Sequence, residues 1–324
     1  MNTTSTPSTV PDESQADVDH DSLTRFLLQG AGVRGVRVHL DTTWAQIRER
    51  AASQAQPAAV TELLGEAAAA AALFTGHAKV EGRLSVQLRG DGPLRTLFAE
   101  CTAAGTLRGI AQVADGAAPT RDLRELGADP VLAITIENPG RGGREPIRYQ
   151  GLVALEADSL AGAFEEYFRQ SEQLPTRLLL AADGTRAAGL MLQLLPGGAG
   201  PGAGSGEIDP DGWTRASTLF DTLTPAELLD WPAATLLRRL FHEDAPSLLG
   251  SRPLRFACSC SRERVAAMLQ SLGRDEAEAA VAAGGGQAEI RCEFCGQRYW
   301  FEPAEVDALF TPQTPAAPAP ERLQ

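Results

Sequence analysis

Residues 258–260 read Cys-Ser-Cys, and after thirty-one intervening residues the chain continues Cys292-Glu293-Phe294-Cys295-Gly296. These two short pairs hold four of the five cysteines in the chain. Thiolates are soft, negatively charged ligands, and zinc binds four of them tetrahedrally at about 2.3 Å. The spacing therefore predicts one closed zinc site, without an open position for a substrate, whose ligands are Cys258, Cys260, Cys292 and Cys295.

The residues around the two pairs predict a small folded module. Ser261 is a candidate N-cap for a helix that ends at Gly273, and a second short helix is expected to reach about residue 283. Two short strands, 288–291 and 298–301, are expected to flank the CxxC pair. About sixty residues make too small a core to stand alone, so zinc, with an apparent binding free energy of about 10–16 kcal/mol, is expected to supply much of the stability.

A four-cysteine site of this kind has two interpretations. In the first, the metal is a purely structural link between two segments. In the second, the site is a redox switch, because thiolates are the oxidisable form of cysteine and each pair is close enough in sequence to form its own disulfide. Spacing alone does not choose between them.

Composition limits the function classes. The chain has 324 residues, which favours two or more domains, and a net charge of −13, which makes nucleic acid and anionic membranes poor partners. No apolar run reaches the roughly 18 residues that span a bilayer, and no signal peptide is visible. Cysteines in metal spacing without a signal peptide predict a reducing, cytoplasmic location.

Five segments are expected along the chain. Runs of strands with few helices indicate an α+β core with a mixed or antiparallel sheet, rather than a doubly wound parallel sheet. No GxxxxGK[ST] motif occurs, so ATP use is not suggested. The segments are a disordered acidic extension (1–20), the core domain (21–195), a Gly/Pro loop with a helical linker (196–250), the zinc module (251–310) and a Pro-rich disordered tail (311–324).

Three details of the first 250 residues bear on function. Alternation over 33–40 predicts a strand with Arg37 and His39 on a solvated face. Cys101, the fifth cysteine, is expected to be a buried, small apolar residue. The linker helices are short and interrupted by Pro232, so their leucines, among them Leu236 and Leu237, are expected to need a packing partner.

The cysteine pattern and several further segments carry a family resemblance that extends from about residue 22 to about residue 310. The CxC…CxxC pattern resembles that of the bacterial redox-regulated heat-shock chaperone of thirty-three kilodaltons, an ATP-independent holdase. Other segments are similar to stretches typical of that family: Leu-Ser-Val-Gln-Leu-Arg-Gly-Asp-Gly-Pro-Leu at 84–94, Tyr-Gln-Gly at 149–151, Tyr-Phe at 167–168, Ser-Glu-Gln-Leu-Pro-Thr at 171–176 and Gly-Leu-Met-Leu-Gln at 189–193.

The resemblance implies a fold and a mechanism. The fold is an α+β core, a helical linker and a C-terminal zinc module. In the reduced form, the four cysteines bind one zinc ion and the chaperone is inactive. Oxidation under unfolding stress forms the disulfides Cys258–Cys260 and Cys292–Cys295, expels zinc and unfolds the linker. The active form, a homodimer, then holds unfolding client proteins; it is not an enzyme.

Two other function classes compete with this interpretation. A nucleic-acid-binding zinc ribbon needs a basic patch, but residues 251–300 contain seven arginines and six acids, and a zinc tetrathiolate would leave a net charge of about −1. A thiol oxidoreductase places its CxxC at a helix N-terminus. Here Cys292 follows an expected strand, and Gly296 follows the motif, which favours a zinc knuckle.

Overall fold

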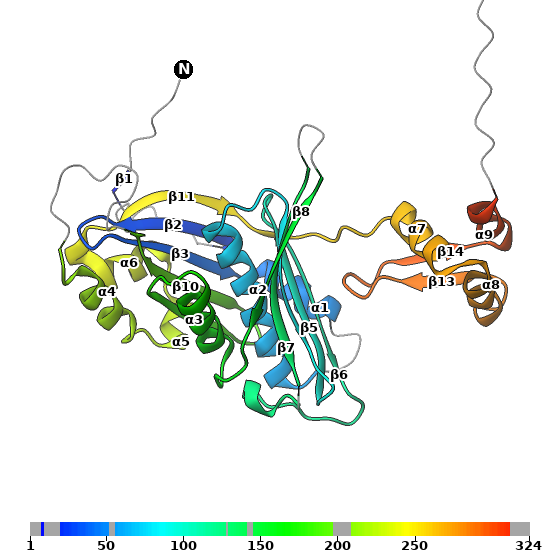
Figure 1. Ribbon diagram of the computed structural model, residues 1–324, viewed down its shortest axis with the longest axis horizontal. Coiled ribbons are helices and arrows are strands. Elements are labelled where there is room, and N and C mark those ends of the chain that lie inside the picture. The colour runs from blue at the N-terminus through cyan, green and yellow to red at the C-terminus, as the bar shows by residue number, and fades with distance from the viewer. Residues whose placement is uncertain are drawn as a thin grey trace, which may run out of the picture. The chain divides into compact units, whose positions relative to one another are not determined.

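A computed structural model of the protein describes residues 8–9, 20–51, 56–127, 129–140, 145–196 and 209–311. The chain divides into two compact units, Met1–Cys258 and Ser259–Gln324. The first unit contains two sheets and the helices that cover them, and the second is a small module of helices and one hairpin (Figure 1).

Sheet A of the first unit has six strands among the described residues, and all its neighbours run antiparallel. Strands β3 (Val33–Leu40) and β10 (Ala187–Leu194) pair over their whole length, with Val33 opposite Leu194 and Leu40 opposite Ala187. In spatial order the strands are β1 (Ser8–Thr9), β11 (Ser247–Pro253), β2 (Ser22–Leu28), β3 (Val33–Leu40), β10 (Ala187–Leu194) and β9 (Thr176–Ala182).

Sheet B also has six strands in the described part of the chain. They pair antiparallel, except that the two-residue strand β12 runs parallel to its neighbour. Their order is β12 (Arg255–Phe256), β6 (Thr106–Val113), β5 (Leu94–Thr102), β4 (Arg83–Arg89), β7 (Val131–Asn138) and β8 (Ile147–Val153).

Helix α2 (Ala58–His77) lies between the two sheets (Figure 1) and contacts strands of both. Its alanine-rich sequence has a physical reason, because both sheets approach closely: a Cβ at Gly65 would lie 2.5 Å from the Cβ of Ala182. By length and hydropathy α2 could cross a membrane, but 78% of its most apolar window is buried inside the protein. It is therefore the core helix that joins the sheets.

Four shorter elements complete this part of the first unit. Helix α3 (Leu160–Ser171) is capped by Ser159, whose Oγ accepts a hydrogen bond from Gly162 N, and its Phe164 and Phe168 pack edge-on against Phe74 of α2. The elements are α1 (Thr42–Ala51), α3 (Leu160–Ser171) and the 3-10 turns η2 (Leu123–Glu125) and η4 (His242–Asp244).

One face of sheet A packs against α2, and the linker helices cover the opposite face. The linker helices are α4 (Gly212–Phe220), α5 (Pro225–Asp230) and α6 (Ala233–Phe241). A capping box is present at Thr224 and Glu227. Apolar side chains of these helices form a second buried cluster with strands of sheet A, whose members include Phe26, Leu28, Leu190, Leu192, Leu228, Leu236, Leu237, Leu240 and Phe241.

This covering makes one expectation wrong. Arg37 and His39 were expected on a solvated face of their strand, yet they are only 1% and 8% exposed. The linker helices lie over that face, and Arg37 Nη2 donates a hydrogen bond to the backbone oxygen of Trp231 at 2.5 Å. Buried polar groups of this kind need partners, and the linker supplies one.

A second difference concerns the end of the predicted helical linker. Residues 247–250 were expected to be helical, but they begin strand β11, which pairs with β2. An apolar strand edge needs a hydrogen-bonding neighbour, and β11 provides it for β2. The strand continues to Pro253, and β12 follows almost at once.

The second unit has a small core. Its elements match the expected order of two helices and a hairpin, and a last helix follows. Six apolar side chains are buried in it: Val265, Leu269, Ala277, Ala288, Phe301 and Val306. The elements are α7 (Arg262–Leu272), α8 (Arg274–Ala283), β13 (Ala288–Arg291), β14 (Arg298–Phe301) and α9 (Pro303–Phe310).

The predicted fold class is confirmed: helices and antiparallel sheets form an α+β core, with linker helices and a small C-terminal module. Three predicted segments lie largely outside the described residues. Of the extension 1–20, only Ser8–Thr9 and His20 are described; of the Gly/Pro loop, Pro196 is described; of the tail, Thr311 is described.

Candidate metal centre

The CxxC pair sits in the turn of the β13–β14 hairpin. Cys292 N donates to Gln297 O and Gly296 N donates to Cys292 O, both at 2.8 Å, so the backbone folds tightly around the pair. Gly296 has φ +72, a left-handed conformation that suits glycine because it has no Cβ. The turn brings Cys292 and Cys295 to one side, as a zinc knuckle requires.

The CxC pair follows strand β12. Arg255 N and Ala257 N donate to backbone oxygens of Gly105 and Leu107, which carries the extended chain as far as Cys258. Helix α7 then begins, and its N-cap Ser261 accepts a hydrogen bond from Arg264 N at 3.3 Å. The two cysteines therefore occupy the short extended segment between a strand and a capped helix.

The structure brings these four cysteines together. Their sulfur atoms all lie within 4.8 Å of one another, and Cys260 Sγ is 3.4 Å from Cys295 Sγ. Each of the four cysteines is half-buried. Four sulfurs at about 2.3 Å from a tetrahedral zinc are about 3.8 Å apart, so this donor set fits the metal in both chemistry and size. All four coordination positions would be filled by protein, which suits a closed site rather than a catalytic one. Their role as zinc ligands stays a prediction.

Tyr299 is a neighbour of the cluster that the sequence analysis missed. Its hydroxyl donates to Cys260 Sγ at 3.2 Å, and this hydrogen bond, with the nearby thiolates, raises the pKa of Tyr299 to about 12. Hydrogen bonds to ligand sulfurs orient them and reduce their charge density. The available signal was its place on β14, four residues after Cys295.

Arg108 of β6 is a second missed neighbour. Burial by itself would lower the pKa of Arg108, but Glu100, whose Oε1 is 3.0 Å from its Nε, and then Cys258 raise it. A partly buried cation beside a sulfur favours the thiolate, which is the metal-binding form. No sequence signal pointed to Arg108, because 150 residues separate it from Cys258.

Cys101 does not join the cluster. It lies fully buried in β5, as expected, and burial raises the pKa of its thiol to about 11. A thiol that stays protonated is a poor nucleophile and a poor metal ligand. Packing in the apolar core therefore accounts for a cysteine at this position.

Arginine contacts fasten the elements of the module around its small core. Arg262 stacks 4.3 Å above the ring of Phe301, and its two terminal nitrogens donate to Trp300 O and Glu305 Oε1 at 2.9 and 2.7 Å. Arg274 bridges Glu278 and Asp307. These contacts are half-exposed ion pairs, and each contributes little, about 0–1 kcal/mol. A metal bound at the cysteine cluster would contribute more, roughly 10–16 kcal/mol if it were zinc.

Comparisons with known proteins give the chain a family. The family model described as "Hsp33 protein" matches residues 21–302. The 33 kDa chaperonin of Ectopseudomonas mendocina (strain ymp) is 44% identical over 305 residues, covering 94% of this chain and 99% of that protein. The 33 kDa chaperonin of Azotobacter vinelandii is 43% identical, with the same coverage.

A solved structure supports the same fold. The crystal structure of the 33 kDa chaperonin (heat shock protein 33 homolog) from Thermotoga maritima superposes with a TM-score of 0.71 and covers 90% of this chain and 97% of that one. Its sequence is 22% identical, so it supports the fold alone.

Proposed function

The chain belongs to the Hsp33 protein family, and from this premise we propose that it is an ATP-independent holdase that oxidation switches on. In the proposed inactive form, Cys258, Cys260, Cys292 and Cys295 are reduced and hold one zinc ion. In the proposed active form, they are oxidised, and the protein binds unfolding clients and prevents their aggregation.

The observation that carries the proposal is a four-cysteine cluster on a module with six buried apolar side chains. Full burial of such side chains contributes about 1.5–3 kcal/mol for a large one and less for alanine, and chain entropy opposes it at about 1–2 kcal/mol per residue. Bound zinc would supply roughly 10–16 kcal/mol of folding free energy. Losing the four thiolates would therefore unfold the module.

The redox step balances with a two-electron oxidant such as hydrogen peroxide. Each cysteine pair gives up two electrons and forms one S–S bond, Cys258–Cys260 or Cys292–Cys295, while one peroxide is reduced to two waters. Two peroxides and four protons convert four thiolates into two disulfides and four waters. Disulfide sulfurs carry no charge, so they no longer hold a zinc ion.

The linker helices connect the switch to a client-binding surface in this proposal. They cover Phe26, Leu28, Leu190 and Leu192, all fully buried side chains on one face of sheet A. If unfolding of the module releases these helices, both their leucines and that face of the sheet become exposed. Contiguous apolar surface of this kind binds partly unfolded proteins.

Further parts of the proposal follow from the family. The oxidised form is proposed to be a homodimer in the cytoplasm, with unfolding proteins as clients and no nucleic-acid or membrane partner. The segments 21–195, 196–250 and 251–310 are proposed to act as the core, linker and switch domains, with catalysis in none of them.

The test is light scattering from a heat-denatured client. The protein is added either reduced and zinc-loaded or after peroxide treatment at elevated temperature, and a chelating dye reports zinc release. We expect suppression of scattering by the oxidised form only, with one zinc released. A Cys101→Ala variant, which keeps all four cluster cysteines, should behave in the same way. Equal suppression by both forms would leave zinc a structural role, and no suppression by either would refute the holdase.

A further inference from the structure

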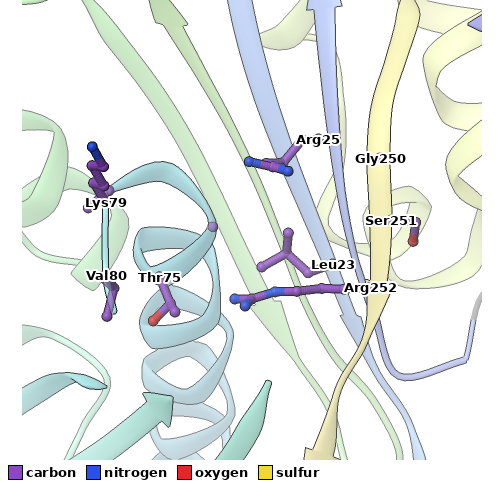
Figure 2. Close-up of a pocket in the computed structure, with 10 residues that line it drawn as sticks. Leu23, Arg25, Thr75, Lys79, Val80, Gly250, Ser251 and Arg252 are labelled. Carbon is purple, nitrogen blue, oxygen red and sulfur yellow. The ribbon is translucent and has the colours of Figure 1, made fainter. Parts of the chain in front are cut away.

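A cleft on the first unit has a chemistry different from that of the cysteine cluster, because cationic side chains line it. It lies between β2, β11 and the C-terminal end of α2, and its volume is about 300 Å³. Figure 2 shows the guanidinium groups of Arg25 on β2 and Arg252 on β11 extending toward the end of α2, where Lys79 follows the helix.

The charge of the cleft is strongly one-sided. Arg25, Lys79 and Arg252 line it, and no aspartate or glutamate does. Within the described residues, none of the three cations forms an ion pair with a carboxylate. This is unusual in a chain with a net charge of −13. Lys79 is also the only lysine in the sequence. Three cations that line one cleft without a counter-charge among its lining residues create a positive potential there.

Arg252 adds a local hydrogen-bonding deficit. Its Nη1 donates to Ala103 O at 2.6 Å, but its Nε and Nη2 are buried without a hydrogen-bond partner in the part of the chain that the structure describes. A buried charged donor without a partner is costly, and an anion at the cleft would offset that cost. Arginine and lysine together favour an oxyanion with several acceptor oxygens.

One feature of the cleft works against an anion. Helix α2 ends at His77, and the carbonyls of a helix C-terminus carry about half a negative charge. Ala78 N already bonds to Phe74 O, which satisfies one of these carbonyls. Three full positive charges outweigh the remaining partial charge.

We propose that the cleft formed by Arg25, Lys79 and Arg252 is a binding site for inorganic phosphate and short polyphosphates. The two arginines would donate hydrogen bonds to phosphate oxygens, and Lys79 would supply a third charge from the opposite wall. Because the three residues come from β2, β11 and the segment after α2, a bound phosphate would tie β11 to the core. The site is independent of the chaperone activity proposed above.

The single lysine allows a direct test on the full-length, reduced, zinc-loaded protein. An amine-acetylating reagent is added with inorganic phosphate, with pyrophosphate, or with sodium chloride at the same ionic strength, and the acetylation rate of Lys79 is followed by mass spectrometry. If the Kd is about 1 mM, about 5 mM phosphate leaves about one sixth of the sites free, so the rate at Lys79 should fall about sixfold. The N-terminal amine serves as an internal reference.

Matched variants separate a site from a general charge effect. Arg252→Gln and Arg25→Gln should each abolish the protection; Arg25 is exposed, so its variant is expected to fold even if Arg252→Gln does not. Arg169→Gln, on α3, removes the same charge elsewhere and should keep the protection. Each of three results would overturn the proposal. Acetylation could slow equally at Lys79 and at the N-terminal amine, or neither phosphate nor pyrophosphate could slow it. The third such result is unchanged protection of Lys79 in Arg25→Gln.

Discussion

Replacing Leu237 with alanine should loosen the linker helices from sheet A without changing the metal centre. Leu237 is fully buried in the cluster that joins α6 to Phe26, Leu190 and Leu192. Truncating a buried leucine costs about 2–5 kcal/mol, because apolar contacts are lost and a cavity remains. A cost of about 3 kcal/mol raises the population with the helices undocked by about 100-fold, since each 1.4 kcal/mol is a factor of ten.

The assay is amide hydrogen exchange, read by mass spectrometry on peptides from α4, α5 and α6 in the reduced, zinc-loaded protein. Exchange there should accelerate by about two orders of magnitude, while zinc content stays at one per chain. If the proposed function holds, the reduced variant should also suppress client aggregation in part. Arg238→Ala is the control, because Arg238 is exposed on the same helix and surface changes usually cost within about 0.5 kcal/mol.

One result would show that the linker helices do not open separately from the rest of the fold. If Leu237→Ala lowers the melting temperature of the whole protein but exchange in the three helices rises no more than in Arg238→Ala, the helices do not open as a separate element. The proposed route from the module to a client-binding face would then lose its physical basis.

Three further predictions concern the metal and the pH dependence of stability. Cys292→Ser should weaken zinc retention strongly, because a hydroxyl is a poor zinc ligand. Transfer of zinc to a chromogenic chelator measures retention, and Ser259→Ala is the control. Equal retention in both variants would contradict the proposal that Cys292 is a ligand. Burial raises the pKa of Glu66 to about 7 despite its ion pair with Arg121, so ionisation of Glu66 destabilises the fold as the pH rises from about 4.5 to 7. In urea unfolding, Glu66→Gln should therefore raise the free energy of unfolding by about 2 kcal/mol more at pH 8 than at pH 5. An equal change at both pH values would contradict the raised pKa. Burial lowers the pKa of His77, so protonation favours the unfolded chain and stability should fall as the pH drops below about 6.5. His77→Gln should reduce this loss of stability in acid, measured as the free energy of unfolding against pH. A pH dependence identical to that of the wild type would show that His77 does not cause the loss.

Local chemistry made much of the module predictable. A two-residue gap followed by Gly296 requires a tight turn, and the flanking strands 288–291 and 298–301 were expected with the bounds that the hairpin has. The burial of Cys101 was likewise expected, since a free cysteine in an apolar strand behaves as a small hydrophobic residue. These features depend on contacts between residues that are near in sequence.

Neighbours from distant parts of the chain could not be predicted in the same way. Arg108 reaches Cys258 only because β6 and β12 pair, and Arg25 and Arg252 line one cleft only because β11 joins β2. Pairing between strands so far apart is decided by the packing of the whole core, and one sequence carries no direct signal for it.

The sequence by itself determined the strand over 33–40, its alternation and the four-cysteine centre; the tertiary structure decided which faces water reaches. Period-two alternation separates two faces of a strand, but it does not say what covers each face. In β3 one face packs against α2 and the other lies under helices from nearly two hundred residues later, so Arg37 is buried and donates to Trp231. The physical reason is that burial belongs to the assembled core, whereas ligand spacing and turn chemistry belong to the local chain.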